Sequence, residues 1–232
     1  MNRLTIMTLC RGIGFSGELV WLRFVGLKAF MSERCESSRK GLIGLESIRS
    51  FMAFDIDSEA VLKRMADAQS LLVKTGADLK LVEPKNIHIT LRFLGNIMPD
   101  MVDKIHESMK VVQFVPFDVE IRGVGAFPKA QYANVVWAGI AKSADQLQGI
   151  FSQLEPRLRG LGFAPDPKGF SPHLTIARVK SGRNKAELGK FIDENKGFEF
   201  GVVRAACLRL KRSDLTPKGP IYSTLREFCP QV

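Results

Sequence analysis

Two short stretches of the chain share one pattern, and this repetition constrains the fold more than any other feature. His88-Ile89-Thr90-Leu91 and His173-Leu174-Thr175-Ile176 both read His, apolar, Thr, apolar. In a β-strand alternate side chains point to the same face, so each His shares a polar face with its Thr. The chain has only 3 histidines. Two matching polar faces therefore predict a pseudo-symmetric site with one histidine from each half of the chain.

The segments around these repeats carry longer patterns. They are residues 48–55 (IRSFMAFD), 86–95 (NIHITLRFLG), 171–178 (SPHLTIAR) and 213–222 (SDLTPKGPIY). Together they resemble the 2H phosphoesterases, a superfamily named for two His-x-Thr/Ser-x motifs. Within it they are most similar to the archaeal and bacterial RNA 2′,3′-cyclic phosphodiesterases, once described as 2′-5′ RNA ligases. The resemblance covers roughly residues 48–232.

This resemblance implies a fold, a reaction and two roles. The fold is α+β and bilobal, with two antiparallel sheets flanking a central groove and helices outside, all within residues 48–232. The reaction is hydrolysis of RNA 2′,3′-cyclic phosphate ends to 2′-phosphate ends. By the same resemblance, His88 is the general acid that donates a proton to the leaving oxygen, and His173 is the general base that accepts one from water.

The residue types suit this chemistry. Hydrolysis of a cyclic phosphodiester needs a base on one side of phosphorus and an acid on the other, and imidazole serves either role near neutral pH. The hydroxyls of Thr90 and Thr175 can donate hydrogen bonds to the phosphoryl oxygens. We therefore expect a reaction that needs no metal and no cofactor.

Three further side chains are candidates for substrate contact. Arg92 has the strand parity of His88, so an unbroken strand would point it into the groove. Arg178 has the opposite parity to His173 and reaches the groove only if its strand ends or bends. Phe127 lies in a loop where it can either stack on a nucleobase or belong to the core. His106 falls in an amphipathic helical frame, and we assign it no chemistry.

The charge of the chain favours an anionic partner. The formal net charge is +10, and residues 48–232 alone hold 27 Lys and Arg against 20 Asp and Glu. An RNA ending in a 2′,3′-cyclic phosphate is such a partner. No protein partner is indicated, and we expect a monomer.

The four cysteines, Cys10, Cys35, Cys207 and Cys229, have no C-x-x-C spacing. Free thiols in a cytoplasmic protein are the simplest interpretation. A zinc site would need more clustered ligands than this sequence offers. Charged residues interrupt the apolar N-terminal run, so no membrane-spanning segment is expected.

Residues 1–47 differ from the rest and are expected to form a poorly ordered extension. They contain a G-x-G-x-x-G string at residues 12–17, which is a dinucleotide-binding fingerprint only when a strand, a helix and an acidic residue follow in register. No second βαβ pattern follows it here. The alternative function of a nucleotide-dependent oxidoreductase is therefore supported by this glycine string alone.

Helical periodicity predicts helices at residues 60–74, 99–110, 143–159 and 185–194, with Ser143 as the N-cap of the third. Alternating patterns predict strands at 48–56, 114–126, 132–140, 198–210 and 221–228, besides the two repeats. Other substrates stay open within the enzyme class: small cyclic nucleotides, 2′-5′ linkages, or RNA ligation in reverse. A non-catalytic module that binds RNA ends also stays open.

Overall fold

The computed structural model of the protein describes residues 46–166, 169–217 and 219–231. In this part of the chain the strands form two antiparallel sheets. The four-stranded sheet has the order β3 (His88–Ile97), β1 (Ile48–Asp55), β8 (Leu208–Thr216), β9 (Gly219–Phe228). The five-stranded sheet has the order β2 (Leu79–Leu81), β6 (His173–Val179), β5 (Val135–Lys142), β4 (Phe117–Phe127), β7 (Glu199–Ala205).

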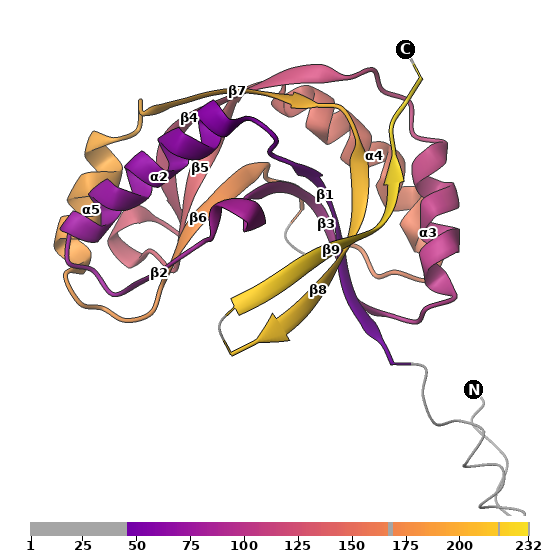
Figure 1. Cartoon of the computed structure of the whole chain (residues 1–232), viewed down its shortest axis with the longest axis horizontal. Coiled ribbons are helices and arrows are strands. Elements are labelled where there is room, and N and C mark those ends of the chain that lie inside the picture. The colour runs from indigo at the N-terminus through magenta and orange to yellow at the C-terminus, as the bar shows by residue number, and fades with distance from the viewer. Residues whose placement is uncertain (1–45, 167–168, 218, 232) are drawn as a thin grey trace, which may run out of the picture. The chain divides into compact units, whose positions relative to one another are not determined.

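The helices lie on the outside of the sheets (Figure 1). Helices α2 (Glu59–Lys74) and α5 (Lys185–Glu194) pack on the five-stranded sheet. Helices α3 (Met101–Lys110) and α4 (Ala144–Gly160) pack on the four-stranded sheet. The result is the expected bilobal α+β fold, in which each lobe contains one of the two histidine strands.

The two lobes are not two consecutive halves of the chain. Helix α2 follows β1 of the four-stranded sheet but packs on the five-stranded sheet. Helix α4 follows β5 of the five-stranded sheet but packs on the other sheet. Each sheet is thus covered on its outer face by a helix whose preceding strand belongs to the opposite sheet.

Helix α2 shows how local sequence sets these elements. Ser58 occupies its N-cap, where the side-chain oxygen accepts a hydrogen bond from the backbone N–H of Val61 at 3.4 Å. The buried residues Met65, Ala68 and Leu72 recur on one face at helical spacing. Gly76, at a φ of +68°, ends the helical path, just after the predicted end of this helix at residue 74.

Two predicted details of secondary structure were wrong. Ser143 is at the N-cap position of α4 but does not cap it, because its hydroxyl donates to the carbonyl oxygen of Asp118 at 2.7 Å. The stretch 198–210 is divided between β7 and β8, which belong to different sheets. The chain passes from one lobe to the other at Ala206 and Cys207.

The interpretation of all four cysteines as free thiols was also wrong. Cys207 and Cys229 form a disulfide, with Cα atoms 4.3 Å apart. They lie one residue outside the pair Leu208 and Phe228, so the antiparallel β8–β9 ladder brings them opposite each other. The redox argument for a cytoplasmic location therefore does not hold for this pair, and Cys10 and Cys35 lie outside the described residues.

Within the described ranges, none of the helices is both long enough and apolar enough to cross a membrane. The prediction for residues 1–47, including the glycine string, lies outside the described residues except for Glu46 and Ser47. It stays a prediction.

Candidate active site

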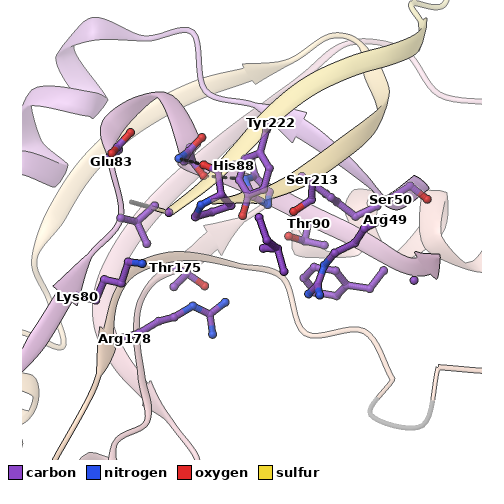
Figure 2. A pocket seen from close by; sticks show the side chains of 18 of the residues that line it. Arg49, Ser50, Lys80, Glu83, His88, Thr90, Thr175, Arg178, Ser213 and Tyr222 are labelled. Atoms are coloured by element: carbon purple, nitrogen blue, oxygen red, sulfur yellow. Dashed lines mark hydrogen bonds between the residues drawn. The ribbon is translucent and has the colours of Figure 1, made fainter. Parts of the chain in front are cut away.

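A groove of about 700 Å³ lies between the two sheets and is lined by residues of both. The His and Thr of each repeat line it: His88 and Thr90 from β3, and His173 and Thr175 from β6. Figure 2 shows Thr90 and Thr175 on opposite walls. The structure therefore brings together the four side chains that the repeated pattern predicted to share a site.

The two imidazoles are held in the same way. Nδ1 of His88 lies 2.8 Å from the carbonyl oxygen of Asn86, and Nδ1 of His173 lies 2.7 Å from the carbonyl oxygen of Ser171. Each carbonyl belongs to the residue two positions earlier in the chain. Because a carbonyl oxygen can only accept, Nδ1 of each ring carries the hydrogen and Nε2 is left to exchange a proton.

Aromatic side chains fix the position of His88. Its ring is 4.8 Å from the ring of Phe51 and 5.3 Å from that of Tyr222, which meets it edge-on. Asn86, whose carbonyl orients the imidazole, is itself anchored, because its side-chain nitrogen donates to the carbonyl of Pro220 at 3.0 Å. Strand β9 thus supports the first histidine both directly and through Asn86.

The second histidine has an aromatic neighbour of its own. The ring of Phe127 lies 4.9 Å from that of His173 and 5.4 Å from that of Trp137. Trp137 can lie there because Gly125 is beneath it, where a Cβ atom would meet the indole at 2.2 Å. Phe127 is not among the groove-lining residues, so the structure places it as a support for His173.

Burial lowers the pKa of both histidines. For His88 the loss of hydration, with a smaller contribution from the charge of Lys211, lowers the pKa to about 4. Burial also lowers the pKa of His173, and the charge of Arg178 acts in the same direction. In the free protein at neutral pH, both rings are therefore neutral.

Both histidine strands contain a β-bulge at the same place. Leu91 is an extra residue in β3, since Thr90 pairs with Ala53 and Arg92 pairs with Met52. Ile176 is the equivalent extra residue in β6, three positions after its histidine. A bulge shifts the alternation of side chains by one, so the strand presents opposite parity to the groove beyond it.

The bulge in β3 overturns the expectation for Arg92. This arginine is only 7% exposed and does not line the groove. Its Nε donates to the carboxylate of Glu155 on α4 at 3.0 Å, and its other nitrogens donate to the carbonyls of Phe93 and Ala164. Phe93 takes the groove position in its place and is 58% exposed.

The equivalent bulge in β6 brings Arg178 into the groove. Arg178 has the opposite strand parity to His173 and could reach the groove only if the strand bent, and the bulge supplies this bend. Arg178 is exposed and lines the groove. Gln69, a buried residue of α2, holds the bulge by donating from Nε2 to the carbonyls of Ile176 and Val82, at 2.9 and 2.7 Å. No sequence signal marked either bulge.

The groove gathers the unpaired cations of both sheets. In the described chain the strands carry eleven Lys and Arg side chains, of which eight have a carboxylate within 4.0 Å. The three without one are Arg49, Lys80 and Arg178, and all three line the groove. None of the eight paired cations does. This distribution gives a site for an anion.

Sequence reasoning missed Arg49, Lys80 and Phe93, because nothing in the sequence separated them from other surface residues. Ser213 and Tyr222, from the segment 213–222 that carries part of the family resemblance, line the groove as well. His106 lies away from it, on α3, with Nε2 3.0 Å from the carbonyl oxygen of Glu227. It remains without an assigned role in the chemistry.

Two His-x-Thr strands on opposed antiparallel sheets, with both imidazoles directed into one groove, define a 2H phosphoesterase. Residues 50–228 match the model of the AKAP7 2′5′ RNA ligase-like domain family. The chain belongs to this family and, as the following relatives show, to the RNA 2′,3′-cyclic phosphodiesterases.

Several curated relatives carry that name. A protein of Aeropyrum pernix is 40% identical over 164 residues, which is 71% of this chain and 93% of the relative. One of Archaeoglobus fulgidus is 39% identical over 181 residues, covering 78% and 99%. One of Thermotoga maritima is 34% identical over 184 residues, covering 78% and 94%. All three are named RNA 2′,3′-cyclic phosphodiesterase. The chain is thus an enzyme of the cyclic phosphodiesterase class.

Solved structures agree on the fold. The protein TT0787 of Thermus thermophilus superimposes with a TM-score of 0.65 at 26% identity, over 78% of this chain and 97% of that one. E. coli LigT in its phosphate complex gives a TM-score of 0.61 at 18% identity, over 79% and 98%. At that identity the second comparison supports the architecture only.

Proposed function

We propose that this protein hydrolyses RNA 2′,3′-cyclic phosphate ends to 2′-phosphate ends, using His88 and His173 as an acid–base pair and no metal. The main support is the shared geometry of the two imidazoles. Each is fixed through Nδ1 by a backbone carbonyl, and each leaves Nε2 for the groove that holds the unpaired cations.

The reaction proceeds by in-line displacement. Nε2 of His173 takes a proton from water as the water oxygen attacks phosphorus. The bond between phosphorus and the ribose 3′-oxygen breaks, and His88 delivers a proton to that oxygen. The 2′-ester bond is retained, which gives a 2′-phosphate. The hydroxyls of Thr90 and Thr175 donate to the phosphoryl oxygens where negative charge develops, and Arg178 neutralises part of that charge.

His88 has to take up a proton from solvent when the substrate binds. With a pKa of about 4, this ring is neutral in the free protein at pH 7. A phosphodiester anion placed beside it favours the charged imidazolium and raises the pKa. Binding of the substrate therefore converts His88 into the protonated form that it needs as the general acid.

One copy of the chain is enough for this reaction, because both histidines belong to it. We accordingly propose a monomer acting on RNA. We retain the cytoplasm as the proposed location, on the strength of the RNA substrate alone.

Product analysis tests this function. A short RNA with a 2′,3′-cyclic phosphate is incubated with the protein in excess EDTA, and its end is identified by digestion and chromatography. We expect a 2′-phosphate at an undiminished rate. A 3′-phosphate product, loss of turnover that a divalent ion restores, or binding without turnover would each contradict the proposal.

A further inference from the structure

The groove holds more free positive charge than one cyclic phosphate can use. A 2′,3′-cyclic phosphodiester carries a single negative charge, as each phosphodiester does. Three cations without carboxylate partners face the groove in the described part of the chain: Arg49, Lys80 and Arg178. The surplus leaves charge available for a ligand with further anionic groups.

Arg49 stands out among the cations of its own sheet. The four strands of that sheet carry six Lys and Arg side chains, and Arg49 alone lacks a carboxylate partner in the described chain. The other five and their partners are Arg92 with Glu155, Arg209 and Lys211 with Asp55, Arg212 with Asp214, and Arg226 with Asp103. The one cation left free is also the one that lines the groove.

Arg49 and Arg178 line the groove from different sheets, Arg49 from β1 and Arg178 from β6. Arg178 is three residues from Thr175 on the same strand, and its charge lowers the pKa of His173, so it is close enough to the catalytic pair to contact the reacting phosphate. The charge of Arg49 is not among those that act on His173; it opposes the burial that raises the pKa of Tyr222 in β9, where the charge of Arg178 acts in the same direction and more strongly. Figure 2 shows the two guanidinium groups extending from opposite walls toward the same opening.

We propose that Arg49 binds the phosphodiester linking the terminal nucleotide of the RNA to the preceding one. This rests on the proposed function and adds a second phosphate subsite to it. The guanidinium can donate two parallel hydrogen bonds to one phosphate, and it loses no internal ion pair in doing so. The subsite makes the enzyme favour oligonucleotide ends over cyclic mononucleotides.

The test compares three substrates that differ only in the second phosphate. They are adenosine 2′,3′-cyclic phosphate, the dinucleotide ApA with a 2′,3′-cyclic end, and the same dinucleotide with an uncharged methylphosphonate linkage. For wild-type protein, kcat/KM should be highest for the charged dinucleotide. Arg49→Ala should lower this value roughly tenfold, the size expected for one charge-assisted contact, and should change the mononucleotide value far less.

Two comparisons keep the result specific. The methylphosphonate should lower wild-type kcat/KM about as much as Arg49→Ala does, and the two changes combined should cost no more than either alone. Arg212→Ala removes the same charge from the neighbouring strand, where it is paired with Asp214 and outside the groove. This control should keep the dinucleotide preference.

Three outcomes would overturn the assignment. They are an equal loss on all three substrates, a dinucleotide preference that survives Arg49→Ala, or one that disappears in Lys80→Ala but not in Arg49→Ala. If the wild-type protein turns over no cyclic phosphate, the proposed function fails. Binding measured by calorimetry then still tests whether Arg49 contacts the second phosphate. Adenosine 2′-phosphate and the matching dinucleotide 2′-phosphate should then differ in Kd for wild-type protein and not for Arg49→Ala.

Discussion

Phe93 and Arg178 occupy equivalent positions, each five residues after a groove histidine and just beyond a β-bulge. The two strands are alike up to that point, since His, Thr and bulge recur in the same order. They then present an aromatic ring on one wall and a guanidinium on the other. The groove therefore combines two similarly held imidazoles with two different walls.

The central prediction concerns the two histidines. His88→Ala or His173→Ala should each reduce kcat by roughly 10²-fold or more, because general acid or base catalysis contributes at least that much. RNA binding should change less, since proton transfer matters in the transition state. Turnover of a cyclic-phosphate RNA and its Kd are the measurements.

The double variant gives a further check on the pair. Because residues that act as a unit are not additive, its loss should be smaller than the product of the two single losses. His106→Ala is the matched control, since this third histidine lies outside the groove. A folded His88 or His173 variant with near-normal turnover would contradict the mechanism.

The pH dependence follows from the lowered pKa values. In the free protein His88 releases its proton near pH 4, and His173 does so below its usual 6.5. The form of the pair that carries one proton is then most populated between the two pKa values. The value of kcat/KM should therefore be highest on the acid side of neutrality and fall as the pH rises. The acid and alkaline limbs of this pH–rate curve belong to the coupled pair and not to one histidine each.

Because bound phosphate raises the pKa values of both histidines, the curve of kcat against pH should lie at higher pH than that of kcat/KM. A kcat/KM that is flat between about pH 5 and 9 would count against this.

Gln69 should affect catalysis through Arg178. Gln69→Leu removes both hydrogen bonds that hold the β6 bulge and should cost about 1–3 kcal/mol in the free energy of unfolding. It should also raise KM, because the bulge is what turns Arg178 into the groove. Urea denaturation and steady-state kinetics measure the two effects.

The same substitution in Arg178→Ala protein separates an effect on the position of Arg178 from a simple loss of protein stability. In Arg178→Ala protein, Gln69→Leu should have no further effect on KM, although it should still lower stability. Gln148→Leu, at an exposed position of α4, serves as the control. If Gln69→Leu raises KM equally in both backgrounds, Gln69 has only a structural role.

The boundary of the domain can be tested by truncation. A protein that begins at Ile48 keeps all of β1, whose pairing starts with Ile48 opposite Ile97. It should fold and retain kcat/KM within about twofold of the full chain, since every groove residue remains. Circular dichroism measures the folding of this protein, and turnover of an RNA with a 2′,3′-cyclic phosphate measures its activity. An insoluble or inactive product would mean that residues 1–47 contribute to the domain.

The paired His-x-Thr pattern was enough to predict the core of the site, because a period of two fixes which side chains share a face. Arg92 was assigned to the groove on the same reasoning and proved to be buried. One inserted residue in a strand reverses the parity, and Leu91 looks no different in the sequence from any other apolar strand residue.

The remaining differences depend on contacts between distant strands. Whether a cation is free or paired is decided by where carboxylates from other elements lie, as Asp55 does beside Lys211, 156 positions away. This is why Arg49 and Lys80 carried no signal. The disulfide between Cys207 and Cys229 likewise requires the register of β8 against β9. Periodicity within one segment contains neither kind of information.

The exchange of helices between the lobes has a consequence for how the enzyme loses activity. Neither sheet can keep the whole of its outer face covered if the other detaches, because α2 and α4 each join a strand of one sheet to the surface of the other. Melting should therefore be cooperative across both lobes. No partly unfolded species should retain one histidine in its native setting while the other is released, so heat or denaturant should abolish the acid and the base in a single transition.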